Sequence, residues 1–373
     1  MFGTNLERKA GRIVDPIERL KYLRRHARTI PGGIRPPGSR RSWLLLAALA
    51  VLILGGWASK PVPVQGQVQN RERPRVLPES TTPLAGSSPR VWRVEGSAGW
   101  EVYSNGLRID LSFATHNRPR ARYPIFALAG NATPSGYGEA PRGIVYHITE
   151  SLVEPLQEEA SHRLQYIGRN LLDVIRRERA YHYLIDRFGR VFRVVEESDA
   201  ANHSGKSVWA DASGIYVNLN DSFLSIAFEG QMEATEEITM AQVTAARMLT
   251  EMLRWRYPMP VENFVTHAQV SVNPDNMRMA AHTDWARDFP FAALGLPDNY
   301  AVPPASLYAF GFSYDDTFLR ISGGGWKGLA LAEDRLARQA EQAGSTPARL
   351  RSMLQHRYKD IAAALKEQSD GGM

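Results

Sequence analysis

Between residues 136 and 300 the chain alternates strand-like and helix-like stretches, and this alternation constrains its fold more than any other feature. Residues 143–148 (GIVYHI) and 223–228 (FLSIAF) are short apolar runs typical of buried strands. Residues 151–178 and 239–257 carry apolar side chains at helical spacing. This mixture predicts an α/β fold in which helices pack on the faces of a β-sheet.

Two further regions flank this body. Residues 100–111 (WEVYSNGLRIDL) alternate apolar and polar side chains about an Asn-Gly pair, which predicts a β-hairpin. Residues 328–343 and 346–367 combine a Leu/Ala stripe with a charged opposite face. They predict a helical C-terminal appendage.

The net charge of +6 is concentrated at the N-terminus. Residues 1–42 hold eleven Lys and Arg against three Asp and Glu, a net charge of +8, which leaves −2 for the rest of the chain. A nucleic-acid-binding domain would carry a basic face of its own. We therefore expect no nucleic-acid partner.

Residues 43–58 (WLLLAALAVLILGGWA) form an apolar run without a polar face. A helix of this length spans about 24 Å, short of the ~30 Å hydrocarbon core, so a membrane span would be short or would need help from its flanks. Positive charge before the run orients the N-terminus to the cytoplasm, so we expect the rest of the chain in the periplasm or outside the cell. Small residues at Gly56 and Ala58 suit a cleaved signal peptide, whereas the long basic arm favours an uncleaved anchor, which we prefer.

The chain has nine histidines and no cysteine. An exported body therefore has no disulfides, and any metal site must use nitrogen and oxygen ligands. The HExxH motif of helix-borne zinc sites is absent. His147 and His267 each lie at the end of a short apolar run, where a lone histidine is more often a core residue than a ligand.

Five segments carry motifs whose order and spacing match those of one family. They are 145–149 (VYHIT), 181–192 (YHYLIDRFGRVF), 202–205 (NHSG), 220–230 (NDSFLSIAFEG) and 264–291, which contains FVTH, HTD and FPF. Together they resemble the zinc-dependent amidase type 2 family of N-acetylmuramoyl-L-alanine amidases, which includes the peptidoglycan recognition proteins. The resemblance implies a mixed central β-sheet flanked by helices.

Position by position, the resemblance implies that His147, His267 and Asp284 bind Zn²⁺. Two imidazoles and one carboxylate leave a fourth coordination position for water or substrate, as catalytic zinc sites do. The set needs no thiolate, which suits a chain without cysteine.

The third ligand position departs from the family pattern. An insertion around residues 271–280 lengthens the segment between His267 and Asp284, and Trp285-Ala286 stands where the family has Pro-Gly. His282 and Asp275 therefore remain alternatives to Asp284 at the metal.

The resemblance also implies a reaction, the hydrolysis of the amide between N-acetylmuramic acid and L-alanine in peptidoglycan. Glu229 matches the catalytic glutamate that takes a proton from water and returns it to the leaving amine. His282 stands where many members have a lysine that stabilises the oxyanion. Tyr181 is expected to line the site and orient substrate or water.

Two other functions compete with the active enzyme: a non-catalytic peptidoglycan-binding module, and a membrane-anchored scaffold with a vestigial enzyme. We prefer the enzyme because each ligand position and the Glu229 position hold competent residues. The expected regions are a basic cytoplasmic arm (1–42), a transmembrane anchor or signal segment (43–58), a flexible linker (59–91), a hairpin-containing extension (92–135), an amidase type 2 catalytic domain (136–300) and a helical C-terminal extension (301–373).

Overall fold

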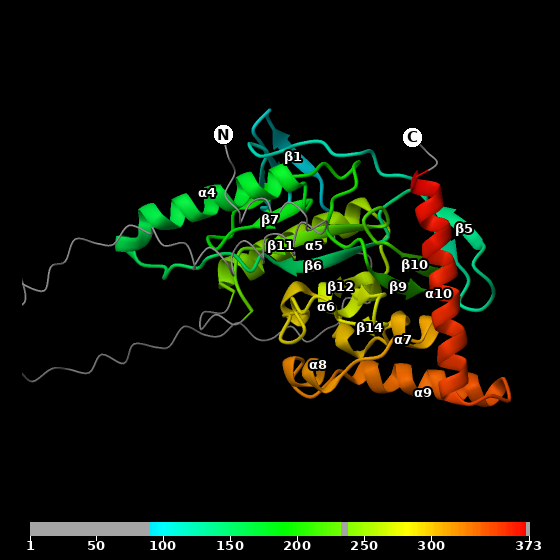
Figure 1. The fold of residues 1–373 in the computed structure, drawn as a ribbon. Coiled ribbons are helices and arrows are strands. Elements are labelled where there is room, and N and C mark those ends of the chain that lie inside the picture. The colour runs from blue at the N-terminus through cyan, green and yellow to red at the C-terminus, as the bar shows by residue number, and fades with distance from the viewer. Residues whose placement is uncertain (1–89, 233–237, 371–373) are drawn as a thin grey trace, which may run out of the picture. The chain divides into compact units, whose positions relative to one another are not determined.

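The computed structural model describes residues 90–232 and 238–370 (Figure 1). The predicted basic arm, the apolar run 43–58 and nearly all of the linker lie outside the described residues. In the part of the chain that the structure describes, no helix is both long and apolar enough to cross a membrane.

The central sheet is mixed and has eight strands. In spatial order they are β1 (Arg93–Gly96), β2 (Trp100–Tyr103), β3 (Arg108–Asp110), β8 (Val191–Arg193), β7 (Tyr183–Ile185), β11 (Phe223–Phe228), β6 (Gly143–Ile148) and β12 (Phe264–Thr266). The strands β7, β11, β6 and β12 are parallel neighbours, so their carboxyl ends meet at one edge of the sheet. The predicted mixed α/β architecture is confirmed.

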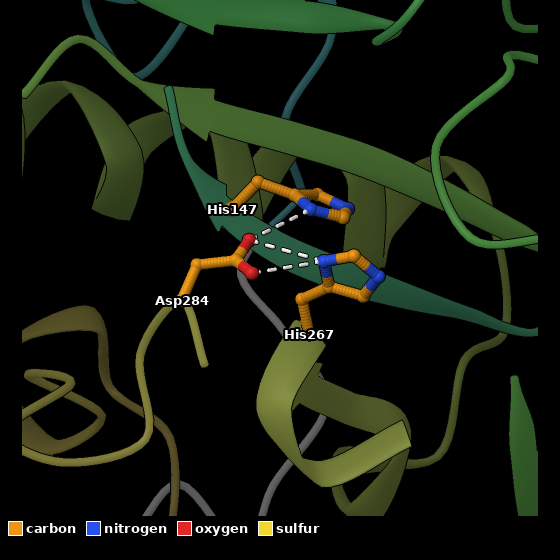
Figure 2. A group of neighbouring side chains, drawn as sticks. All are labelled: His147, His267 and Asp284. Carbon is orange, nitrogen blue, oxygen red and sulfur yellow. Dashed lines mark hydrogen bonds and ion pairs between the residues drawn. The ribbon is translucent and has the colours of Figure 1, made fainter. Parts of the chain in front are cut away.

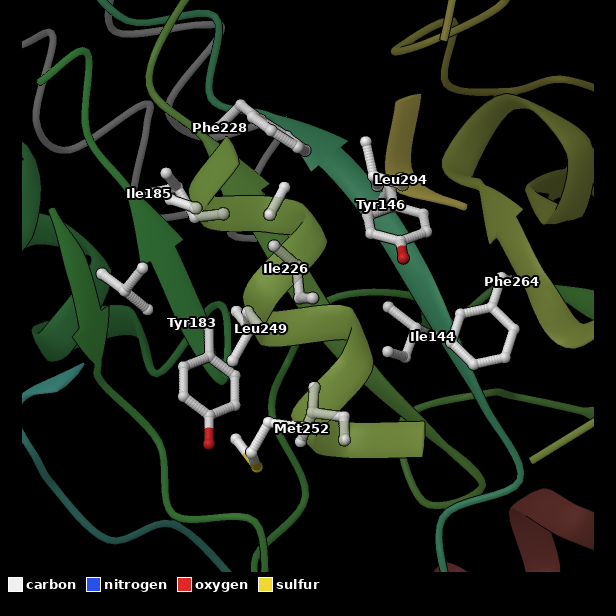
Figure 3. Close-up of a cluster of buried hydrophobic side chains, with 14 of the residues drawn as sticks. Ile144, Tyr146, Tyr183, Ile185, Ile226, Phe228, Leu249, Met252, Phe264 and Leu294 are labelled. Atoms are coloured by element: carbon white, nitrogen blue, oxygen red, sulfur yellow. The ribbon is translucent and has the colours of Figure 1, made fainter. Parts of the chain in front are cut away.

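One long helix covers each face of this sheet. α5 (Met240–Arg256) packs on one face, where Leu249 and Met252 join the largest buried cluster (Figure 3). α4 (Ser161–Glu178) packs on the other face, where its Ile175 joins a second cluster with Leu184 and Ala227 of the strands. Burial of apolar side chains on both faces explains why the strands are apolar runs rather than alternating ones.

Of the two helices predicted in the body, one is present as predicted and the other is shorter than predicted. The helix expected over 239–257 is present as α5 and begins after Thr239, whose hydroxyl accepts a hydrogen bond from the Gln242 backbone N–H at 3.1 Å. The helix expected over 151–178 begins only at residue 161, after a 3₁₀ turn at Glu158–Ala160. Pro155 explains why the helix does not run from residue 151, because a proline inside a helix removes a backbone donor and clashes with the preceding turn.

The predicted hairpin about Asn105-Gly106 is formed by β2 and β3. Because β3 pairs with β8 in parallel, the hairpin extends the central sheet. Gly106 has a φ of 87°, which glycine adopts without steric cost.

A buried ion-pair network links this hairpin to the body of the protein. Arg193 donates to Glu101 of β2 at 2.7 Å. Glu197 accepts hydrogen bonds from Arg256 at 2.7 and 2.8 Å and from the Tyr257 hydroxyl at 2.7 Å. Burial alone would raise the pKa of Glu197, but Arg256 and its other partners outweigh burial and lower it.

We expect Glu197→Gln to lower the free energy of unfolding by about 3 kcal/mol, because removing one member of a buried ion pair leaves a charge without its partner. Urea unfolding of the folded chain measures the change. Glu139→Gln is the control: Glu139 pairs with Arg122 on the surface, so its loss should cost at most about 1 kcal/mol. Equal losses of unfolding free energy in the two variants would contradict a structural role for the network.

The two helices predicted over 328–343 and 346–367 are present, two further short helices precede them in a stretch expected to be irregular, and all four pack into the body. Their bounds are α7 (Ala305–Phe310), α8 (Asp316–Ile321), α9 (Lys327–Gln342) and α10 (Pro347–Asp370). They share a buried cluster with a second sheet of four strands, β5 (Pro134–Gly138), β4 (Tyr123–Phe126), β10 (Gly214–Val217) and β9 (Val208–Asp211). Buried Phe310 and Phe312 lie in this cluster with Phe126 and Ile215 of the sheet. The C-terminal region was expected to be an appendage, but its helices form part of the protein core.

Candidate metal centre and active site

Parallel pairing of two strands places two histidines side by side. β12 pairs with β6 so that Val265 lies opposite Val145 and Thr266 opposite Tyr146. The residues that follow in this register are His267 and His147, at the carboxyl edge of the sheet. Their rings are buried, with centroids 4.5 Å apart. His267 is also the first residue of the short helix α6 (His267–Val270).

Asp284 completes a group of three potential ligands. Its carboxylate lies 3.2 Å from His147 Nδ1 and 3.0 Å from His267 Nδ1, so both rings turn the same nitrogen toward it (Figure 2). One ligand atom from each residue lies within 4.8 Å of the others. Within the described ranges, no other set of three His, Asp or Glu side chains meets the same condition.

The two alternatives for the third ligand position are not members of this group. Asp275 is exposed, in the insertion between the short strands β13 (Val272–Asn273) and β14 (Arg278–Met279). His282 stacks on His267, with centroids 4.4 Å apart and planes 16° apart. The structure thus groups Asp284 with the two histidines and places His282 beside them.

The protonation states in this group suit a metal. Burial lowers the pKa of His267 to about 3, although Asp284 acts in the opposite direction. Burial would raise the pKa of Asp284, but His267 and His147 outweigh burial and hold it well below its usual range. A neutral imidazole and an ionised carboxylate are the forms that bind metal ions. The donor set of two imidazole nitrogens and one carboxylate fits zinc with an open coordination position.

A third buried histidine, His203, contacts the group, and the sequence motifs had not assigned it a role. His203 Nδ1 lies 3.2 Å from His147 Nε2, the nitrogen that faces away from Asp284. The His203 loop is held by Asn220, whose side-chain oxygen accepts from the backbone N–H groups of His203 and Ser204. Such contacts to the second nitrogen of a ligand histidine orient its ring. The NHSG motif had indicated this loop.

Tyr181 lies against the same group. Its ring centroid is 5.0 Å from that of His147, and its side chain is buried in the cluster beneath α4. The structure thus places Tyr181 at the site, packed between His147 and the core.

Glu229 follows β11 directly at the carboxyl edge of the sheet. Because Ala227 is the register partner of His147, side-chain alternation places Glu229 on the same face as His147, beyond the end of the strand. Its carboxylate accepts a hydrogen bond from the Arg187 backbone N–H at 3.2 Å. Burial raises the pKa of Glu229, and the nearby charge of Asp186 adds to the effect.

If Glu229 acts as a base, its raised pKa predicts where kcat/KM falls on the acid side of the pH profile. The base must be ionised, and a raised pKa means that protonation occurs at a higher pH than for an ordinary glutamate. We therefore expect kcat/KM to fall as the pH drops through a value above 4.5. Arg190→Gln removes a charge that lowers this pKa, so it should move the limb to still higher pH. A limb that stays in place or moves to lower pH would contradict Glu229 as the group that titrates.

The mixed β-sheet with helices on both faces makes this an α/β protein. The buried His-His-Asp group at one edge of the sheet is its candidate metal site. Residues 137–285 match the model of the family described as Amidase_2, N-acetylmuramoyl-L-alanine amidase. The family resemblance predicted from the motifs is confirmed for this segment. No curated protein is similar enough to this chain to count as a relative.

Several solved structures are similar to part of the chain. The amidase LysC from Clostridium intestinale is 22% identical, with a TM-score of 0.28, and the match covers 44% of this chain and 90% of LysC. AmpDh3 from Pseudomonas aeruginosa, in complex with an anhydromuramic pentapeptide, is 21% identical, with a TM-score of 0.32 and coverages of 52% and 77%. AmiD from E. coli, in complex with anhydro-N-acetylmuramic acid-L-Ala-D-gamma-Glu-L-Lys, is 21% identical, with a TM-score of 0.28 and coverages of 47% and 58%.

Proposed function

We propose that this protein is a zinc-dependent amidase that hydrolyses the bond between N-acetylmuramic acid and L-alanine in peptidoglycan. The observation that carries the proposal is the convergence of His147, His267 and Asp284, which lie within the segment that matches the amidase family. All three are buried. Burial lowers the pKa of His267, and His267 and His147 hold the pKa of Asp284 low, so a neutral imidazole and an ionised carboxylate face each other in forms that bind a metal.

The metal would be held by His147, His267 and Asp284. Zinc, when bound, supplies a Lewis acid that polarises the scissile carbonyl. His203 would orient the ring of His147 by contacting its second nitrogen.

The proton transfers are assigned to Glu229. In the hydrolysis, the oxygen of water forms a bond to the carbonyl carbon and the bond from that carbon to the L-alanine nitrogen breaks. Glu229 accepts a proton from the attacking water and delivers it to the leaving nitrogen, which departs as a free amine. A raised pKa suits both steps, because it brings the carboxyl closer to the pH at which the enzyme works.

His282 and Tyr181 are assigned to substrate. His282 is proposed to donate an N–H to the oxygen that gains negative charge when water adds to the carbonyl. Its stacking on His267 supports this role, because it holds the imidazole beside the ligand group. Tyr181 is proposed to orient substrate or water next to His147.

The location of the reaction is proposed from the sequence. The apolar run 43–58 would anchor the chain in the cytoplasmic membrane, or be cleaved on export, and the catalytic part would act outside the membrane. Peptidoglycan, or muropeptides released from it, would be the partner at the site.

Digestion products test the proposed function. Purified protein is incubated with peptidoglycan and with soluble muropeptides, and the products are identified by mass spectrometry. We expect stem peptides with a free N-terminal L-alanine and glycan that keeps its lactyl carboxylate. Cleavage between sugars or within the stem would overturn the proposed reaction, and binding without cleavage would instead indicate a peptidoglycan-binding module.

A further inference from the structure

The backbone next to Asp284 is held by two aromatic side chains from beyond the segment that matches the family. The Tyr300 hydroxyl donates to the Trp285 carbonyl at 2.8 Å, and the Trp326 indole N–H donates to the Ala286 carbonyl at 2.7 Å. Two successive carbonyls directly after Asp284 are therefore fixed by tertiary hydrogen bonds. We call residues 283–289 the Asp284 loop.

The conformation of the Asp284 loop requires such support. Trp285 has a φ of 57° and Asp288 a φ of 58°, a left-handed conformation that residues other than glycine rarely adopt. Non-glycine residues remain there only where the surrounding structure holds them. Trp285 and Ala286 stand where the family pattern has Pro-Gly, and Trp285 adopts a left-handed conformation that a proline could not adopt, so the turn of this chain differs from the one that Pro-Gly would form.

The two aromatic residues are themselves held firmly. The ring of Tyr300 stacks on that of Trp326, with centroids 5.2 Å apart, and Phe318 of α8 meets Trp326 edge-on at 5.0 Å. Trp326 is buried and directly precedes α9. Tyr300 also accepts a hydrogen bond from the Phe289 backbone N–H at 3.3 Å, at the end of the Asp284 loop.

The insertion before the Asp284 loop is tied to the same C-terminal region. The backbone N–H of Met279 donates to the Ser313 carbonyl at 2.9 Å, and that of Ser313 donates to the Met277 carbonyl at 3.0 Å. Arg278 also pairs with Asp315, the N-cap of α8. Segments on both sides of Asp284 thus rest on residues beyond 299.

We infer that Tyr300 and Trp326 are positioning residues for Asp284, so the C-terminal region is part of the metal-binding unit. The inference rests on the proposed function, because it requires Asp284 to be a zinc ligand. In a family whose members usually turn the chain with Pro-Gly after this ligand, this protein holds the turn with tertiary hydrogen bonds.

The test combines Tyr300→Phe and Trp326→Phe in the full chain, which removes both donors and keeps aromatic rings in place. Trp209→Phe is the matched control, because the Trp209 indole N–H donates to the Asn263 side chain at 3.0 Å, outside the Asp284 loop. Zinc affinity is measured by competition with a chelator, and backbone protection of residues 283–289 by amide hydrogen exchange of the metal-free protein. We expect the double variant to bind zinc about tenfold more weakly, the loss typical of supporting contacts around a metal site. We also expect faster exchange in the loop, with both readouts near wild type in the control.

The outcomes separate this inference from the proposed function. If the wild-type chain binds zinc and cleaves muropeptides while the double variant matches it in zinc affinity and loop exchange, the positioning role is wrong and the amidase stands. If the double variant and the Trp209→Phe control lose affinity equally, the effect is general destabilisation, and the positioning role is again wrong. A wild-type chain that binds no zinc overturns both proposals. Zinc binding that depends on the two donors, without cleavage, supports the positioning role and rejects the amidase.

Discussion

Glu229→Gln is expected to lower kcat for muropeptide hydrolysis by about 10²–10⁴-fold while zinc binding stays unchanged. The substitution keeps the size of the side chain and removes its capacity to accept and return a proton, which is the contribution of a general acid–base group. The amide can still accept the hydrogen bond from the Arg187 backbone, so the local structure should persist. The measurements are steady-state kinetics on a soluble muropeptide and the zinc content of the purified variant.

The control for this experiment is Glu139→Gln, which removes an exposed carboxylate of the second sheet region. It should retain wild-type kinetics. Full activity of Glu229→Gln would exclude Glu229 as the acid–base group. Loss of zinc together with activity would instead assign it to support of the metal site.

His147→Ala is expected to abolish zinc binding under conditions where the wild type is loaded, and to lower activity by at least about 10²–10³-fold. The substitution removes one of three ligands, and losing the electrostatic stabilisation of the reacting carbonyl costs at least this much. It also removes the contact to His203 and leaves a space beside His267 at the edge of the sheet. Metal analysis and kinetics on the same preparation measure both effects.

Two comparisons make the His147 experiment decisive. His162→Ala removes an exposed histidine of α4 and should leave zinc content and activity unchanged. Treatment of the wild type with a chelator should reproduce the loss of activity, and added zinc should restore it. If wall cleavage survives the loss of His147, the proposed mechanism is wrong.

The structure also changes how the scaffold hypothesis can be tested. Deletion of residues 301–373 would be the direct way to separate catalysis from a role of the C-terminal region. The described helices of that region bury Phe310 and Phe312 against the second sheet, and Trp326 donates to the Asp284 loop. A deletion would therefore expose part of the core and disturb the candidate site. The Tyr300 and Trp326 substitutions are the sharper experiment.

Local pattern determined much of the fold. The hairpin turn at Asn105-Gly106, the helix that begins after Thr239 and the buried strands at 143–148 and 223–228 all follow from spacing and capping that lie within a few residues of one another. The helix expected from residue 151 shows the limit of such patterns. Apolar spacing continued through Pro155, but a regular helix does not cross a proline, and the helix begins only at residue 161.

By itself, the sequence named His147, His267 and Asp284 and ranked them above His282 and Asp275 through motif order. Only the tertiary structure decided that these three side chains meet, because strand register and loop packing bring together residues more than a hundred positions apart. Only the tertiary structure likewise showed that His203 contacts His147 and that Tyr300 and Trp326 donate hydrogen bonds to the Asp284 loop. Those contacts join distant segments through single hydrogen bonds, which leave no period or spacing in the sequence and exist only once the chain has packed.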